Sequence, residues 1–227
     1  MAFNAQLDDK VQAYLEEKRV PQLIEHLFHE LAVEMPSDPL RFLATILARP
    51  PKPRVMLIGA PCSGKSTVAR ALGEKYRVPV ISFDELLRTN SAAAVAIQNA
   101  AAVSGGRADA ACAKLVADAA TRAASEAGGW IIDGFPRTRS EAVGLQAARV
   151  LPGLVVVLDV DDDTAATRVT GQMDSAAVAS RGRAFGLNKS ELLACYPEGP
   201  RRVTVDASLN VADVLAQVDP RVEQVLA

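Results

Sequence analysis

The chain has 227 residues, of which 49% are hydrophobic and 23% charged, and its formal net charge is −2 at pH 7. This length suffices for one sizeable core, or for one domain with a small module. Acids and bases are mixed and no apolar run reaches membrane-spanning length, so we expect neither a nucleic-acid partner nor a membrane partner. The three cysteines are scattered without metal-ligand spacing and the first ten residues are polar. Both features favour a cytoplasmic protein.

Residues 1–49 predict a small all-α helical hairpin module. After a candidate short helix over residues 10–19, apolar residues recur at steps of three and one from Val20, which predicts an amphipathic helix. Asp38 is a suitable cap for a second amphipathic helix, with Pro39 in its first turn. The proline-rich stretch 50–53 then predicts a stiff linker to a second domain over residues 54–227.

Two short amphipathic helices cannot enclose a core alone, so they either pack on the following domain or associate with a second copy. Their sequence, over Tyr14–Glu17, Val20–Leu27 and Pro36–Leu43, resembles the dimerisation–docking segment of the regulatory subunits of cyclic-AMP-dependent protein kinase. The resemblance implies a homodimer through residues 10–48 that accepts an amphipathic anchoring helix of a scaffold protein. It also implies tethering to a larger structure, which in similar proteins is often a cilium or flagellum.

Strand and helix patterns alternate from Arg54 onward. The expected strands are apolar runs, at 55–58, 78–82, 130–133, 154–160 and 203–206. Helices are expected between them, including an alanine-rich stretch over 91–127 that is broken near Ser104, and a last helix over 210–218. This alternation predicts an α/β fold with a doubly wound five-stranded parallel sheet flanked by helices. Ligands of such sheets bind beyond the carboxyl ends of the strands.

One stretch carries the phosphate-loop pattern G-x-x-x-x-G-K-[ST] between an apolar strand and a helix start. Its glycines let the backbone turn tightly and approach a phosphate, and the positive end of the helix then faces the anion. Lys65 is expected to reach the β- and γ-phosphates of ATP, and the Ser66 hydroxyl to ligate Mg²⁺. The loop residues expected to bind ATP are Gly59, Ala60, Pro61, Cys62, Ser63, Gly64, Lys65, Ser66 and Thr67.

Three stretches resemble the signature stretches of the adenylate kinase family, in order and in spacing. They are Gly59–Lys65, Ile81–Arg88 and Ile132–Thr138, and the resemblance extends over residues 55–218. It implies an enzyme, a nucleoside monophosphate kinase that moves the γ-phosphoryl group of MgATP to a nucleoside monophosphate and yields two nucleoside diphosphates. In the adenylate kinase family the acceptor is AMP. No residue would act as a nucleophile toward phosphorus, so catalysis would consist of positioning and charge neutralisation.

The resemblance also assigns roles to single residues. Asp133, at a strand end beside the phosphate loop, would share Mg²⁺ or its water shell with Ser66. Arg88 and Arg137 would grip the acceptor phosphate, because guanidinium groups bind phosphate bidentately and stay charged. Additional contacts to the donor phosphates are expected from Arg168, Arg181 and Arg183. Contacts to the acceptor are expected from Ser82, Phe83, Arg88, Arg107, Gly134, Arg137 and Glu141. The candidate catalytic set is Lys65, Arg88, Asp133, Arg137 and Arg168.

Four departures from the family pattern bear on activity. Cys62 stands where the family usually has glycine, and Phe83-Asp84 replaces a small Thr-Gly pair, so the aromatic ring would stack on the acceptor base or block it. Glu141 stands where the family has a glutamine that reads adenine; a carboxylate only accepts hydrogen bonds, which suits guanine or the amine of cytosine or adenine. Gln172 replaces a second arginine and lies shortly before Arg181, which predicts a lid of the short kind.

These departures leave other functions open beside transfer to AMP. One alternative is a kinase that prefers GMP, CMP or UMP, and another is an NTPase or small-metabolite kinase. A third is a catalytically weak or inactive nucleotide-binding scaffold that is docked through its N-terminal helices.

Overall fold

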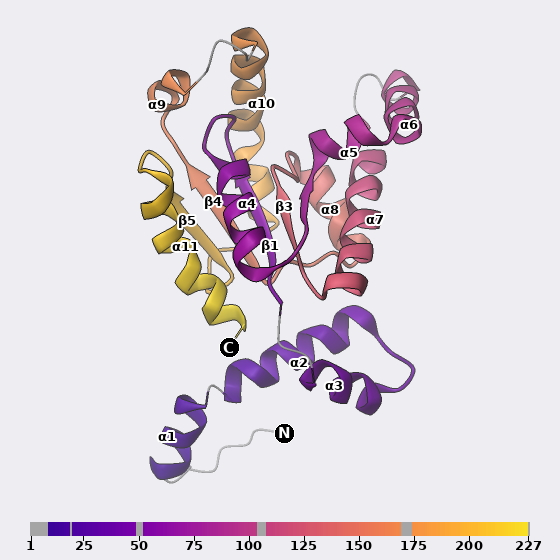
Figure 1. Cartoon of the computed structure of the whole chain (residues 1–227). Coiled ribbons are helices and arrows are strands. Elements are labelled where there is room, and N and C mark those ends of the chain that lie inside the picture. The colour runs from indigo at the N-terminus through magenta and orange to yellow at the C-terminus, as the bar shows by residue number, and fades with distance from the viewer. Residues whose placement is uncertain (1–8, 19, 49–51, 104–107, 169–173, 227) are drawn as a thin grey trace. The chain divides into compact units, whose positions relative to one another are not determined.

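The computed structural model describes residues 9–18, 20–48, 52–103, 108–168 and 174–226. The chain divides into a helical N-terminal unit within Met1–Pro51 and an α/β unit over Lys52–Gln224 (Figure 1). Of the expected linker, residues 50 and 51 lie outside the described ranges. Lys52 and Pro53 belong to the α/β unit, where Lys52 Nζ donates to the carbonyl of Tyr76 and the Pro53 carbonyl accepts from the Trp130 amide.

The N-terminal unit contains α1 (Asp9–Glu17), α2 (Val20–Glu34) and α3 (Pro39–Leu47). The helices follow the predicted positions, and the Asp38 carboxylate caps α3 by accepting from the Arg41 amide at 3.1 Å. Pro39 occupies the first turn of α3, where no backbone donor is required. Several large apolar side chains of this unit are exposed, namely Ile24, Phe28, Leu40 and Leu47.

The α/β unit is built on one five-stranded sheet in which every strand pair is parallel, as predicted. The strands are β1 (Arg54–Gly59), β2 (Val80–Ser82), β3 (Trp130–Asp133), β4 (Leu154–Asp159) and β5 (Arg202–Asp206), in the spatial order β2-β3-β1-β4-β5. Pairing aligns Leu57 of β1 with both Asp133 and Val156. The central strands β1, β3 and β4 are buried on both faces along most of their length and are apolar there, with charged residues only at their ends, at Arg54, Asp133 and Asp159.

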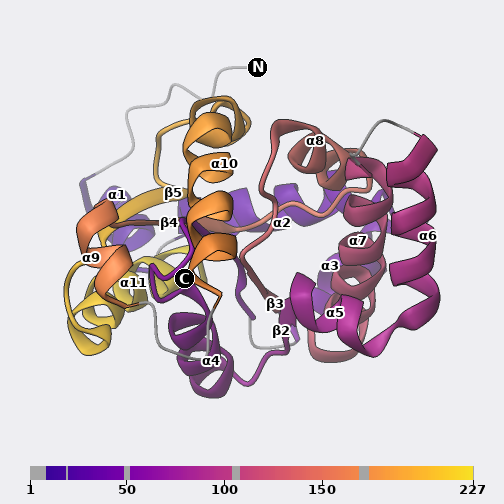
Figure 2. The ribbon, with the colours of Figure 1, turned by 90° about the horizontal axis from the view of Figure 1, so that it is seen from above.

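Helices connect and cover the strands. Their bounds are α4 (Lys65–Tyr76), α5 (Phe83–Thr89), α6 (Ser91–Val103), α7 (Asp109–Ala127), α8 (Arg139–Ala147), α9 (Asp162–Thr167), α10 (Ser175–Ala194) and α11 (Val211–Leu226). Helices α4 and α11 lie on one face of the sheet, and α7, α8 and α10 on the other (Figures 1 and 2). On the second face, Met56 and Ile132 of the sheet pack in one core with Val116 of α7, Leu145 of α8 and Leu192 of α10.

Two elements differ in length from the prediction. Strand β2 begins at Val80 rather than at residue 78; the intervening Pro79 has no amide to donate to the sheet. Helix α11 continues past Val218 and through Pro220 to Leu226. Its second half is anchored because Lys75 Nζ of α4 lies 3.2 Å from a carboxylate oxygen of both Asp219 and Glu223. Among the described helices, none has both the length and the apolar character needed to cross a membrane.

Candidate functional site

The described segments that carry the phosphate loop, Phe83, Asp133 and Arg168 lie beyond the carboxyl ends of the strands. The phosphate loop follows β1, helix α5 follows β2, and the run that begins at Asp133 follows β3. Arg168 follows β4 and α9, as the C-terminal cap of that helix. Because all five strands are parallel, these segments meet at one edge of the sheet, where such folds bind ligands.

The phosphate loop needs its two glycines for different reasons. A Cβ on Gly59 would lie 2.5 Å from the carbonyl oxygen of Leu158 in β4, so no side chain fits there. Gly64 caps α4 with a φ of +85°, a conformation that glycine adopts without steric cost. Cys62 also has a positive φ, of +63°, which is unfavourable for a residue with a side chain. The loop therefore keeps a glycine-like backbone at a position occupied by cysteine.

Lys65 folds back over the loop that precedes it. Its Nζ donates to the carbonyl of Ala60 and, at 3.3 Å, to the hydroxyl of Ser63. Burial lowers the pKa of Lys65 to about 8, against the opposing effect of the nearby Asp133 carboxylate. Burial disfavours the charged form of this ammonium, and a bound anion would favour it again. The site is therefore suited to binding an anion.

Asp133 and Ser66 lie together next to this lysine. Ser66 Oγ donates to Asp133 Oδ2 at 2.6 Å, whereas Asp133 Oδ1 is buried and has no hydrogen-bond partner among the described residues. A cation ligated by this oxygen would satisfy it, and hydroxyl and carboxylate oxygens are ligands that Mg²⁺ accepts. Within the described ranges no three His, Cys, Asp or Glu side chains form a metal-binding group. This is compatible with Mg²⁺, which uses few protein ligands together with phosphates and water.

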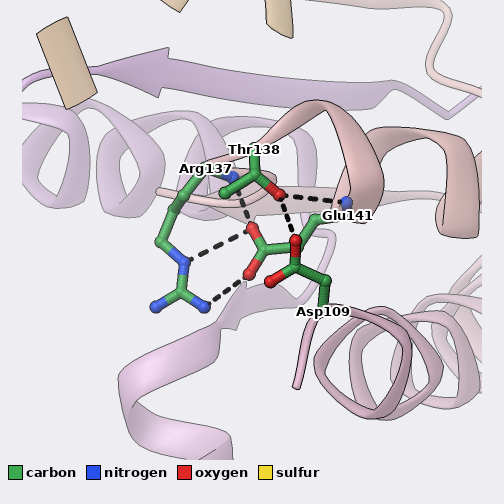
Figure 3. A network of polar contacts seen from close by, with 4 residues as sticks. All are labelled: Asp109, Arg137, Thr138 and Glu141. Carbon is green, nitrogen blue, oxygen red and sulfur yellow. Dashed lines mark hydrogen bonds and ion pairs between the residues drawn. The ribbon is translucent and has the colours of Figure 1, made fainter. Parts of the chain in front are cut away.

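The side chain of Arg137 is held by Glu141 (Figure 3). Arg137 Nη2 donates to Glu141 Oε1 at 2.6 Å, and the Arg137 backbone amide and Nε donate to Oε2 at 2.6 and 3.4 Å. Burial lowers the pKa of Arg137, but the hydrogen bonds and charge of Glu141 outweigh it, so the pKa is raised. Glu141 itself is only 1% exposed. In this ion pair the carboxylate of Glu141 is buried, whereas the guanidinium of Arg137 is partly exposed.

Two phenyl rings lie beside this guanidinium. Phe83 and Phe135 stack with their ring centres 5.3 Å apart, and the Arg137 guanidinium carbon lies 4.3 Å from the centre of the Phe83 ring. Both rings are buried, Phe83 to 4% exposure. In this arrangement Phe83 contacts the arginine and Phe135 instead of offering an open face to a base. Cation–π contact of this kind stabilises a fixed arginine orientation.

The other candidate arginines lie around the same edge with different partners. Arg88 is exposed and lies 3.4 Å from Glu85, and Arg181 of α10 lies 3.5 Å from Asp84 of α5. Arg183 is exposed on α10. Arg168 donates to the carbonyls of Ala207, Ser208 and Leu209 at 2.7–3.4 Å, and also to that of Cys62 at 3.5 Å. Arg168 thus connects the phosphate loop to the segment after β5. Arg107 and Gln172, two further residues considered above, lie outside the described ranges.

Two contacts at this site, Arg137–Glu141 and Thr138–Asp109, were not anticipated from the sequence. Thr138 Oγ1 donates to Asp109 Oδ2 at 3.0 Å and accepts from the Glu141 amide, so α7 and α8 both brace the segment that carries Arg137 (Figure 3). A local signal for the Arg137–Glu141 pair is the Thr-x-x-Glu spacing of Thr138 and Glu141 at the start of α8, because a glutamate at this position reaches back over the residues that precede the helix. The Thr138–Asp109 contact joins residues 29 positions apart, and no local pattern indicates it.

The parallel sheet and the loop between β1 and α4 place the α/β unit among the P-loop proteins with an α/β fold. Comparison with known proteins narrows this class. A model of one family, described as Adenylate kinase, matches residues 57–224. The chain therefore belongs to the adenylate kinase family.

Individual relatives agree with this assignment. Adenylate kinase 8 of Xenopus laevis is 31% identical over 152 residues, which are 66% of this chain and 31% of that protein. Adenylate kinase 8 of Homo sapiens is 28% identical over 170 residues, 70% of this chain and 34% of that protein. The chloroplastic adenylate kinase of Zea mays is 33% identical over 130 residues, 52% of this chain and 55% of that protein. The chain spans about a third of the length of the adenylate kinase 8 proteins that it matches.

Proposed function

We propose that the α/β unit is a nucleoside monophosphate kinase that transfers the γ-phosphoryl group of MgATP to a nucleoside monophosphate, AMP by family resemblance. The observation that carries this proposal is the junction between the phosphate loop and the segment after β3. Ser66 donates to Asp133 at 2.6 Å, and a Cβ on Gly134 would lie 3.5 Å from Lys65 Cε. The proposed donor-phosphate residues thus adjoin the segment that carries Arg137.

The proposed roles follow from charge and position. The amides of Gly59–Thr67 and the start of α4 face the phosphates of ATP, and Lys65 neutralises charge on the transferring group. Arg137 and Arg88 bind the acceptor phosphate on the opposite side, with the backbone of Ser82 and Gly134 at its border. Phosphoryl transfer needs little covalent chemistry from the protein, so alignment and charge neutralisation account for the rate.

Ser66 and Asp133 are the residues that would hold Mg²⁺, directly or through water. The ion held there would supply positive charge that neutralises the phosphates of ATP. Arg168 lies against the backbone of Cys62 and of Ala207, so its proposed role is to shape the donor side, with Arg181 and Arg183 approaching the phosphates from α10.

For the N-terminal unit we propose self-association, as its resemblance to a dimerisation–docking segment implies. Ile24, Phe28 and Leu40 are large, apolar and exposed, and large apolar side chains exposed in this way favour an association site. The proposed homodimer would dock an amphipathic helix of a scaffold protein. Tethering to a cilium or flagellum stays a prediction from the same resemblance. A cytoplasmic location stays a prediction from the scattered cysteines and the polar first ten residues.

The test of the kinase proposal is formation of nucleoside diphosphate from MgATP with AMP, GMP, CMP or UMP, each assayed separately. We expect product with at least one acceptor, and a fall of roughly 100-fold in kcat/KM for the acceptor in Arg137→Ala, the size of effect seen when one charge-stabilising donor is lost. Arg122→Ala, which removes an exposed arginine from α7, is the matched control and should retain full activity. Hydrolysis of ATP without an acceptor would favour an NTPase, and nucleotide binding without turnover a scaffold.

A further inference from the structure

The carboxylate of Glu141 is already occupied within the chain. Its two oxygens accept from three donors of Arg137, two on the side chain and one on the backbone (Figure 3). Its side chain is only 2% exposed, so a nucleobase cannot reach it without displacing Arg137. A residue that is both buried and satisfied is poorly placed to select among bases.

Glu141 binds one side of the guanidinium, and the Cys112 thiol of α7 also lies within hydrogen-bonding reach of the Arg137 side chain. An arginine side chain has five N–H groups, and Glu141 binds Nε and one hydrogen of Nη2. The three remaining N–H groups, on Nη1 and Nη2, point away from the carboxylate, and the side chain is 46% exposed. The Phe83 ring holds the plane of the group at 4.3 Å. The free end of the guanidinium, meaning the N–H groups that Glu141 does not bind, is thus partly exposed, and Glu141, Phe83 and Cys112 limit its orientation.

The first turn of α8 makes this arrangement rigid. Thr138 caps the helix by accepting from the Glu141 amide, while the Glu141 side chain reaches back to the Arg137 amide. Such reciprocal capping fixes the backbone before the helix. Thr138 is held in turn by Asp109 of α7. Glu141 therefore connects the orientation of Arg137 to the packing of two helices.

We infer that Glu141 is a positioning residue: it orients Arg137 so that the free end of the guanidinium meets the acceptor phosphate, and it does not read the acceptor base. This rests on the proposed function, in which Arg137 binds that phosphate. A glutamine at this position, as the family pattern has, offers one acceptor oxygen and one NH₂ group. The NH₂ group would face a donor of Arg137, so in this chain the arginine would lose its bidentate, charged partner and its orientation would no longer be fixed by residue 141.

The test separates the phosphate from the base by using two probes, ribose 5-phosphate and adenosine, each titrated against the full chain by ligand-detected NMR. In Glu141→Gln we expect ribose 5-phosphate to bind about tenfold more weakly and adenosine to bind within twofold of the original affinity. Asp118→Asn is the matched control, because it removes a carboxylate from an exposed i,i+4 pair with Lys114 on α7. It should change neither affinity.

Other outcomes overturn the inference in distinct ways. A changed affinity for adenosine with ribose 5-phosphate unaffected makes Glu141 a base reader, and a parallel fall of both makes it merely structural. Unchanged or tighter binding of ribose 5-phosphate also contradicts positioning. If Arg137→Ala leaves ribose 5-phosphate binding intact, the proposed acceptor role of Arg137 fails as well. If only Arg137→Ala weakens it, the positioning inference fails alone.

A second measurement needs no change at Glu141. In the unsubstituted chain, the NMR signal of the Arg137 side chain, identified by its loss in Arg137→Lys, should shift with ribose 5-phosphate and not with adenosine. A shift caused by adenosine alone would contradict the inference.

Discussion

At the scale of single residues, Lys65 shows how the phosphate loop holds its own lysine. Its ammonium donates to the loop itself, at Ala60 and Ser63, and burial lowers its pKa to about 8. A polyphosphate bound in the loop would supply negative charge and raise this pKa again. Binding of ATP is therefore linked to the protonation of Lys65.

This linkage predicts a pH dependence of ATP binding. The charged form of Lys65 is the one that ATP favours, so affinity is complete below pH 8 and falls by up to tenfold per pH unit above it, until the pKa of the complex is reached. Calorimetry with MgATP from pH 7.5 to 9.5 would measure this, because the phosphates have finished ionising above about pH 7. Lys65→Arg stays charged and should give a flat profile. A flat profile for the unsubstituted chain would refute the linkage.

Cys62 leads to a prediction about stability. With a φ of +63° it lies in the left-handed region, which costs a residue with a Cβ about 1–2 kcal/mol. Cys62→Gly removes this cost but adds freedom to the unfolded chain, so we expect the free energy of unfolding to rise by about 0.5–1 kcal/mol in urea titrations. Cys195, with a φ of −73°, is the matched control. Cys195→Gly should lower stability, and a loss in both variants would argue against strain at Cys62.

Residue types in the sequence located the described candidate side chains at the carboxyl ends of the strands, but they did not show how these side chains pair. Asp133 and Lys65 were recognisable because each stands at a fixed offset in a motif that follows a strand. The hydrogen-bond partner of Glu141 could not be recognised in the same way, because a carboxylate can accept hydrogen bonds from a base or from an arginine. Only the buried geometry shows that Arg137 has taken both oxygens.

At the scale of elements, the contact between α7 and α8 depends on one glycine. A Cβ on Gly144 of α8 would lie 2.6 Å from the Cβ of Ala113 of α7, so the two helices pack more closely than a side chain at position 144 would allow. The same two helices brace Thr138 through Asp109. Packing remote from the phosphate loop therefore contributes to the geometry around Arg137.

We predict that Gly144→Ala lowers the free energy of unfolding by about 1–2 kcal/mol, because overpacking outweighs the gain in helix propensity. Gly186→Ala on α10 is the control, since a Cβ there meets nothing within 4 Å. That variant should raise stability by about 0.5–1 kcal/mol. Thermal or urea unfolding compares the two, and an equal gain in both would contradict the close packing of α7 on α8.

Elements were predictable where the local pattern decides them. Apolar runs predicted all five strands, and Asp38-Pro39 predicted the start of α3. The end of α11 was not predictable in this way, because Pro220 is a local stop signal that tertiary contacts override. Lys75 of α4 and the buried Val222 hold the helix together beyond it. The order of the strands likewise depends on which faces pack together, which no single segment specifies.

At the scale of the whole molecule, the chain joins a kinase-like α/β unit to a helical unit with exposed apolar side chains. If the helical unit self-associates, light scattering should give twice the chain mass of 24.0 kDa. Ile24→Glu with Phe28→Glu places charges on the exposed apolar surface and should yield a monomer. Leu187→Glu on α10 is the control, since Leu187 is also exposed and apolar but belongs to the other unit. A monomer before substitution would contradict self-association.

The proposal that the α/β unit transfers phosphate between nucleotides is tested most directly by following the γ-phosphorus itself. MgATP labelled in the γ-phosphate is mixed with excess protein and a nucleoside monophosphate, and the products of one turnover are separated. We expect the label to move to the nucleoside diphosphate formed from the acceptor, and this transfer to be lost in Lys65→Gln. Label that appears as inorganic phosphate, or that stays in bound ATP with every acceptor, would contradict it.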